Sequence, residues 1–113
     1  MASERLRRVN EAVRQVLSDA ITRDLKDPRV GFVTVTAVQT SPDLRHAHVF
    51  VSVLGDADRE ASLAGLRSAH GFLQRRVGVE LRLKHTPTLA FEYDESIERG
   101  MRVSELIDRE LGR

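Results

Sequence analysis

Basic side chains gather in one segment of this 113-residue chain, and the chemistry that they offer is the binding of anions. The segment from residue 67 to residue 85 holds five basic residues and one acidic residue, a formal charge of +4. The basic residues are Arg67, Arg75, Arg76, Arg82 and Lys84. A planar guanidinium group suits paired contacts with phosphate oxygens, so these side chains predict contacts with a nucleic-acid backbone. A GC-rich genome would produce the same preference for arginine, and this second explanation is at least as good as the first.

The opposite charge gathers near the C-terminus. Residues 92–110 hold seven acidic and three basic side chains, a formal charge of −4, while the whole chain carries only +1. A protein that coats nucleic acid through bulk charge needs a larger positive total. We therefore expect one basic face to bind and the acidic segment to lie elsewhere.

Four further arginines are secondary candidates for RNA contact. Arg7 and Arg14 lie seven residues apart and share a flank of a predicted N-terminal helix, with Arg8 nearer its exposed side. Solubility and a second strip of RNA contacts explain these three about equally well. Arg45 lies in a predicted hairpin loop, where a basic side chain is easily exposed.

No set of residues predicts catalysis or metal binding. His46 and His48 alternate along a predicted strand, but two histidines without a third ligand do not make a metal site. Glu92, Asp94 and Glu95 could suggest paired carboxylates, but their segment is acidic and predicted to be exposed. Asp94 or Ser96 is better interpreted as a helix cap. The sequence also lacks the glycine-rich and nucleophile motifs of common enzymes. We expect no metal, no cofactor and no enzymatic activity.

The composition also predicts where the protein acts. Cysteine is absent, so nothing indicates an oxidising compartment, and we expect a cytoplasmic location. The first residues are charged, and no apolar run approaches the length of a membrane span. We expect neither secretion nor a membrane partner.

The elements that must position these side chains begin with an amphipathic helix. Apolar residues recur every three or four positions from Leu6 to Ile21, which predicts a helix over about 4–25, capped by Ser3 and closed by Asp27-Pro28. Alternation then predicts strands over 31–38 and 46–53, joined in an antiparallel hairpin. The residues expected on the buried face of the first strand are Val33, Val35 and Ala37. Those expected on the buried face of the second strand are Ala47, Val49, Val51 and Val53.

The second half predicts a broken helix pair followed by one strand. The first helix of the pair uses Leu63 and Leu66 as apolar positions, and its pattern breaks at Gly71. A short helix through Leu73 and Val77 should end at Gly78, and residues 81–93 should form a third strand, irregular at Pro87. A final helix or tail is predicted over about 95–113.

This order of elements predicts an α+β fold with a three-stranded mixed sheet covered on one face by helices. At 113 residues the chain has the length of one domain, so we expect residues 1–113 to form a single domain and to act as a monomer.

The element order resembles the type II K-homology (KH) fold, and short signatures resemble the ribosome-binding factor A family. The signatures are Asp27-Pro28-Arg29-Val30, the hairpin residues Ser41-Pro42-Asp43-Leu44-Arg45-His46-Ala47-His48-Val49-Phe50-Val51-Ser52, and Pro87, Leu89, Phe91, Asp94, Ser96 and Gly100-Met101-Arg102. They span almost the whole chain in the expected order. Most KH domains clamp nucleic acid with a Gly-x-x-Gly loop. Here the segment is Ala69-His70-Gly71, which resembles the family's Ala-x-Gly kink and argues against ordinary single-strand clamping.

The resemblance implies a non-catalytic ribosome maturation factor. Such a protein binds the 16S rRNA of the free small (30S) ribosomal subunit, assists late folding and 5′-end processing of that RNA, and leaves before translation with the help of a GTPase. Its RNA-binding face would be centred on the helix-kink-helix, where Ala69 and Gly71 form the bend and His70, Gly71 and the following basic residues approach the RNA.

Other functions remain possible on the residues alone. The chain could be a generic KH-like RNA-binding or protein-interaction module without ribosome specificity, a ligand-sensing α/β module, or an uncharacterised enzyme. A dimer without RNA affinity would indicate an interaction module, and a deep pocket with converging titratable groups would indicate an enzyme.

Overall fold

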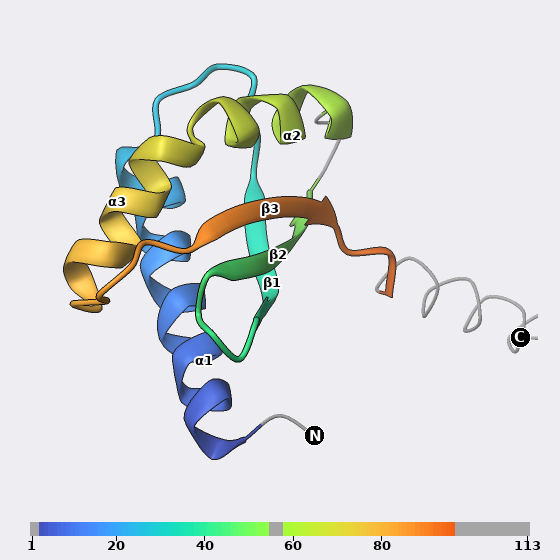
Figure 1. Ribbon diagram of the computed structural model, residues 1–113. Helices are drawn as coiled ribbons and strands as arrows, with labels where there is room; N and C mark the ends of the chain where they lie inside the picture. The colour runs from blue at the N-terminus through green and yellow to red at the C-terminus, as the bar shows by residue number, and fades with distance from the viewer. Residues whose placement is uncertain (1–2, 55–57, 97–113) are drawn as a thin grey trace, which may run out of the picture.

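The helices and strands follow one another in the predicted order. The computed structural model describes residues 3–54 and 58–96 (Figure 1). In chain order the elements are α1 (Glu4–Asp19), a π-helical turn η1 (Ala20–Asp24), β1 (Val33–Thr40), β2 (His46–Val53), α2 (Arg59–Ser68), α3 (His70–Glu80) and β3 (Thr88–Tyr93). The helix or tail predicted at about 95–113 falls almost entirely outside the described residues. No helix within the described ranges is long and apolar enough to cross a membrane.

The first helix forms where the apolar spacing predicts it. The Ser3 hydroxyl accepts a hydrogen bond from the Leu6 amide (3.1 Å), which satisfies an otherwise unpaired donor of the first turn. Val13 and Leu17 are fully buried on the inner face. The last turn widens into η1, and Leu25 then takes an extended conformation. The prediction of a helix over about 4–25 is confirmed, while its π-helical end was not predicted.

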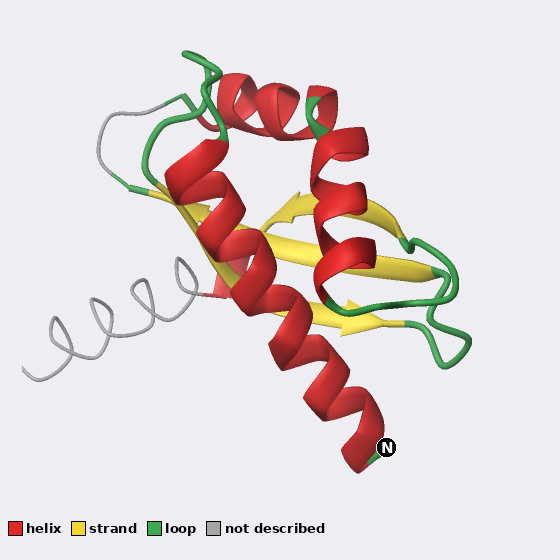
Figure 2. Ribbon diagram, turned by 90° about the vertical axis from the view of Figure 1, so that its left-hand side faces the viewer, coloured by secondary structure: helices red, strands yellow, loops and turns green. Residues whose placement is uncertain are grey.

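The sheet has the strand order β1-β2-β3. β1 and β2 are antiparallel, with Val35 opposite Val51, and β2 and β3 are parallel, with Val49 opposite Phe91. The helices α1, α2 and α3 lie on one face of the sheet (Figure 2). The predicted mixed sheet with one covered face is therefore confirmed.

A β-bulge changes the predicted face of β1. The pairing register shifts between Val35 and Ala37, so Thr36 has no Cα partner on β2. An extra residue reverses the alternation of side chains. Val35 and Val38 are consequently buried, and Ala37, predicted to share the inner face, is only half-buried. The Thr36 hydroxyl bonds to the Phe50 carbonyl (3.2 Å) and to Asp94 Oδ2 (2.5 Å), which connects the irregular position to β2 and to the residue after β3.

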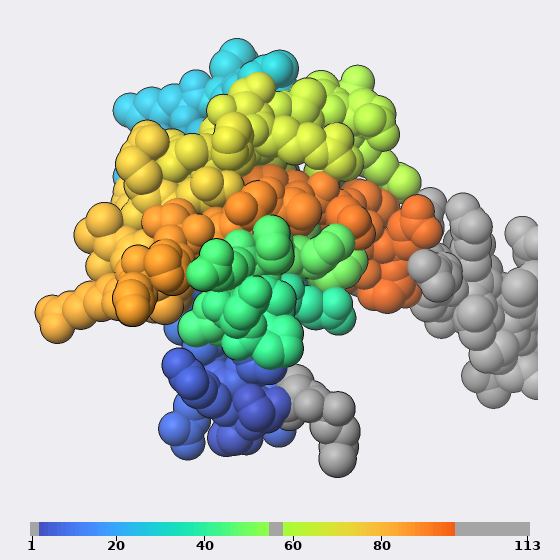
Figure 3. Space-filling view, viewed as in Figure 1, coloured from blue at the N-terminus to red at the C-terminus, as the bar shows by residue number. Residues whose placement is uncertain are grey.

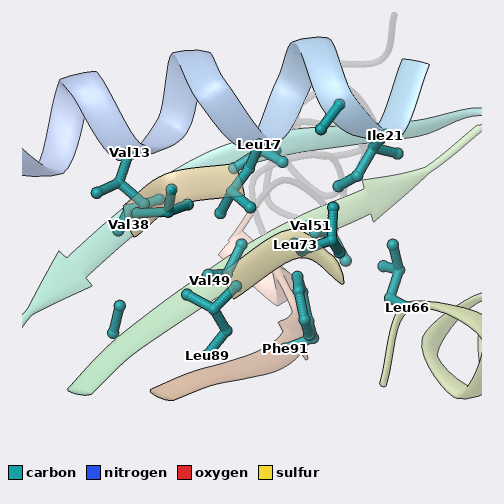
Figure 4. Packing of buried hydrophobic residues seen from close by; sticks show 14 of the residues in the cluster. Val13, Leu17, Ile21, Val38, Val49, Val51, Leu66, Leu73, Leu89 and Phe91 are labelled. Carbon is teal, nitrogen blue, oxygen red and sulfur yellow. The ribbon is translucent and has the colours of Figure 1, made fainter. Parts of the chain in front are cut away.

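The core lies between the helices and the covered face of the sheet. Figure 4 shows Val13, Leu17 and Ile21 of the first helical segment facing the strand residues Val38, Val49 and Val51. Leu66 of α2 and Leu73 and Val77 of α3 complete the core, and all three are fully buried. The burial of a leucine stabilises a fold by roughly 2 kcal/mol, so this layer is the main source of stability.

The break between α2 and α3 falls two residues earlier than predicted. α2 ends at Ser68, the bend is at Ala69 (φ −91°, ψ 9°), and Gly71 lies inside α3. The Ala69 amide lies 3.1 Å from both the Gly65 and Leu66 carbonyls, so α2 closes there without a left-handed residue. Ala69 thus bends the chain as predicted, whereas the prediction that Gly71 does so was wrong.

Gly78 does not end the second helix either, because α3 continues to Glu80. A Cβ atom built at Gly78 would lie 2.9 Å from the Thr86 hydroxyl oxygen. The glycine therefore allows the returning chain to lie against the helix. In the sequence alone, a glycine needed for this tertiary contact cannot be distinguished from one that ends a helix.

The third strand is shorter than predicted, since β3 begins at Thr88 rather than near residue 81. The Arg82 amide bonds to the Val79 carbonyl (3.3 Å) and the Leu83 amide to the Gly78 carbonyl (3.1 Å). This is the Schellman pattern that closes α-helices, and Arg82 takes the left-handed conformation it requires (φ 51°). The prediction that Arg82 and Lys84 share one strand face was therefore wrong.

A close contact at Gly65 yields the first testable prediction. A Cβ atom there would lie 2.6 Å from Val30 Cγ2, so Gly65→Ala should push α2 away from the loop before β1. We expect the free energy of unfolding, measured by urea denaturation, to fall by about 1–3 kcal/mol. Gly71→Ala is the matched control, because its Cβ would meet only the Arg75 guanidinium at 3.6 Å. An equal loss in both variants would contradict the packing argument.

Candidate nucleic-acid interface

The basic segment predicted to bind RNA occupies α3 and the turn that follows it. Arg75 and Arg76 lie in the middle of α3, and Arg82 and Lys84 lie between α3 and β3. Arg75, Arg82 and Lys84 are exposed, as is His85, which was not predicted to contact RNA. In Figure 3 the chain leading from α3 into β3 stands out at the left edge of the molecule. Three of the predicted basic residues are therefore presented to solvent in one region.

Arg76 has a different environment from Arg75. Its Nη2 forms a salt bridge with Asp24 at the end of η1, and its Nε donates to Glu80 Oε1 (2.9 Å). The hydrogen bonds with Glu80 and Asp24 raise the pKa of the Arg76 guanidinium. Arg75 forms no salt bridge within the described part of the chain. Arg76 therefore joins α3 to the end of the first helical segment, and Arg75 is the better placed of the two for phosphate contact.

The bend itself is held by local contacts. Arg67 Nη2 donates to the Phe91 carbonyl (3.0 Å), which turns this side chain toward β3. The His70 Nδ1 lies 2.8 Å from the Arg67 carbonyl, so the ring closes the end of α2. Gly71 is half-buried, and the space that a Cβ would fill touches only the tip of Arg75. Gly71 therefore leaves room for close approach beside Arg75, although it does not form the bend.

Arg82 occupies a position where proteins usually place glycine. Left-handed backbone costs an L-residue roughly 1–2 kcal/mol, and a helix closed by the Schellman pattern commonly has glycine at this position. The conformation aims an exposed arginine out of the turn, one residue before Leu83, which packs against the core. Strain of this kind is often retained at functional positions.

Arg45 lies at the same end of the sheet as the turn after α3. Asp43 accepts from the Ser41 hydroxyl (2.6 Å) and the Arg45 amide (3.0 Å), and these bonds lower the pKa of the Asp43 carboxyl. The Thr88 amide donates to the Arg45 carbonyl (2.8 Å), which joins the hairpin loop to the start of β3. The parallel pairing of β2 with β3 thus places the backbone of Arg45 against the start of β3, at the end of the sheet where the turn with Arg82 and Lys84 enters that strand.

The arginines of α1 form a separate, partly neutralised group. Arg7 Nη1 and Arg8 Nε each lie 3.7 Å from a Glu4 carboxylate oxygen. Arg14 Nε donates to Glu11 Oε2 at 2.9 Å. A hollow of about 520 Å³ separates this flank of α1 from β1, lined by Glu4, Arg7, Arg8, Asn10, Glu11, Arg14, Thr36, Ala37 and Val38. These arginines lie apart from the α3 group and are a weaker candidate for phosphate contact.

The uncovered face of the sheet carries a second group of polar side chains. His48 Nδ1 lies 3.4 Å from Glu92 Oε1, and the His48 ring stacks on Phe50 with centroids 6.2 Å apart.

Asp94 Oδ1 accepts from both the amide (2.9 Å) and the hydroxyl (2.6 Å) of Ser96, which agrees with a cap at this point. Among residues 3–54 and 58–96, no three His, Cys, Asp or Glu side chains gather as metal ligands.

These features define an α+β protein of the type II KH class, with a bent helix pair in place of a glycine loop and exposed cations beside it. The chain belongs to the ribosome-binding factor A family, whose model matches residues 5–107.

Individual relatives agree with this assignment. A ribosome-binding factor A from Halothermothrix orenii is 44% identical over 110 residues, which cover 96% of this chain and 90% of that protein. The crystal structure of the factor from Thermus thermophilus superposes with a TM-score of 0.71 at 26% identity, covering 78% of this chain and 94% of that one. A model of the T. thermophilus factor, fitted into a cryo-EM map of a 30S complex, superposes with a TM-score of 0.63 at 27% identity. The match covers 76% of this chain and 91% of that one.

The strained turn yields a second prediction. Arg82→Gly should relieve the left-handed conformation and raise the free energy of unfolding by roughly 1 kcal/mol, measured by urea denaturation. Arg75→Gly, which removes the same charge from a helix interior, should lower it by about 1 kcal/mol. If Arg82→Gly were less stable than the parent protein, Arg82 would be stabilising the turn. Its left-handed conformation would then give no evidence of a functional role.

Proposed function

We propose that this protein binds the 16S rRNA of free small ribosomal subunits and assists late folding and 5′-end processing of that RNA without catalysing a reaction. The observation that carries the proposal is the exposed cationic group at the α3 end of the sheet in a chain of the ribosome-binding factor A family. The relative fitted into a map of a 30S complex supports the same partner.

The binding energy would come mainly from phosphate contacts. Arg75, Arg82 and Lys84 are exposed, and the Thr88–Arg45 hydrogen bond holds the hairpin loop against the start of β3, at the same end of the sheet. Such contacts position a protein on folded RNA and act through RNA shape rather than base sequence. Holding two RNA segments in one arrangement is a function that needs no reactive side chain.

The proposal includes the conditions under which the protein acts. One domain spanning residues 1–113 would work as a monomer in the cytoplasm. A ribosome-associated GTPase would promote its release before translation. In this proposal the chain binds and departs, while other proteins cut the RNA.

Sedimentation with ribosomal particles tests the partner. The full chain would be centrifuged with free small subunits, large subunits and assembled ribosomes at equal particle concentration. Selective association with free small subunits is the expected result. Equal association with all three particles would contradict the proposal and indicate a generic RNA-binding module.

The salt dependence of small-subunit binding tests the face. A double variant, Arg75→Ala with Lys84→Ala, should lower the slope of log affinity against log salt by roughly 0.7–0.9 for each lost phosphate contact. The matched control is Arg5→Ala with Arg7→Ala, which removes two exposed basic side chains in the first turns of α1, apart from the α3 group. An unchanged slope in the first variant, or an equal change in the control, would show that the α3 end is not the binding face.

A further inference from the structure

The outer face of α3 carries apolar side chains that the fold does not use. Phe72, Arg75, Arg76 and Val79 follow one another at helical spacing and line a shallow hollow of about 330 Å³. The inner face of the same helix holds Leu73 and Val77, both fully buried in the core. α3 is therefore apolar on two sides, and only one of them is covered.

Val79 is the clearest sign that this second face has a separate role. Its side chain is 75% exposed, and valine is a weaker helix former than alanine or leucine. Phe72 is half-buried, packs against the core with part of its ring and presents the rest to the hollow. A single exposed apolar side chain is common on proteins, but Val79 lines the same hollow as the exposed part of Phe72. The two side chains together form an apolar patch that the fold leaves uncovered.

The charges around the hollow indicate the chemistry of that ligand. Arg75 is exposed beside the hollow, and the Arg76 guanidinium lies 5.8 Å from the centre of the Phe72 ring while it pairs with Asp24 and Glu80. Among the described residues, no carboxylate lines the hollow itself. An occupant must offer a flat apolar group together with negative charge at its side. A nucleotide has both, since its base stacks on apolar and aromatic side chains and its phosphate binds arginine.

We propose that this hollow receives one unstacked base of a single-stranded RNA segment, held against Phe72 and Val79, with a neighbouring phosphate on Arg75. The inference rests on the proposed function and deepens it, because it adds a base contact to the phosphate contacts of the same face. A protein helix is a poorer occupant, since it would need a longer apolar stripe than these two side chains provide.

The test compares two probes that differ only in their bases. One is a fluorescent oligouridylate of about twelve nucleotides, and the other is an abasic oligomer with the same phosphates, length and label. The parent protein should bind the first probe more tightly by roughly tenfold, as expected for one stacked base. In Val79→Ser this difference should largely disappear while the salt slope stays the same, because the substitution removes no charge. Serine and valine have similar helix propensities, so α3 should stay folded.

A matched variant separates this effect from a general loss of apolar surface. Leu54→Ser removes an exposed leucine next to the end of β2, far along the sheet from α3, and should keep the parent's preference for bases. Phe72→Leu, which retains apolar packing, should lose part of the preference. Thermal unfolding of each variant confirms that the fold is intact.

Two results would overturn the inference: equal binding of both probes by the parent, and an unchanged base preference in Val79→Ser. If Val79→Ser kept its base preference but lost small-subunit binding, the hollow would be assigned to a protein of the subunit. These results differ from those expected if the proposed function were wrong. In that case the parent protein would show no selective sedimentation with small subunits.

Discussion

The burial of a single face of the sheet is the constraint on which the rest of the molecule depends. Val49 and Val51 of β2 are fully buried beneath α1, α2 and α3, while His48 of the same strand stays exposed. A three-stranded sheet with one apolar face gains stability only when helices cover that face completely. The chain achieves this with a bend at Ala69, which lets both Leu66 and Leu73 reach the core.

The same geometry divides the basic segment by role. Arg67 bonds to the backbone of β3 and Arg76 to acidic side chains of η1 and α3, so both connect elements of the fold. Arg75 and Lys84 remain exposed. A guanidinium already paired with two carboxylates offers less to a phosphate than one facing water, because each new contact must replace an existing one. Net charge along the chain is thus a poor measure of the charge available to a ligand.

Two departures from ordinary local rules lie close together near the end of α3. Val79 is an exposed apolar residue on a helix, and Arg82 is left-handed where glycine is common. They lie within four residues of each other, beside the exposed Lys84. Proteins that otherwise follow local preference tend to depart from it at functional sites. Leu44 in the hairpin loop is also left-handed (φ 61°), and Phe32 (81%) and Leu54 (62%) are exposed apolar side chains at the other end of the sheet. The α3 end is therefore distinguished by its exposed cations, with the strained Arg82 as one of them.

The sequence by itself determined the elements whose signals are local: the amphipathic helix α1, the alternating strands of the hairpin, the broken helix pair and the position of the basic segment. The exact position of the bend and the late start of β3 follow from local backbone hydrogen bonds that close α2 and α3 at residues other than glycine, where the sequence carries no stop signal. Tertiary structure decided the bulge at Thr36 and the role of Gly78, because these depend on chain segments that meet only in the fold. Gly78 illustrates the reason, since Thr86 approaches it from the returning chain. The availability of each arginine has the same origin: Arg76 and its partner Asp24 lie 52 residues apart, a separation that no local pattern can reveal.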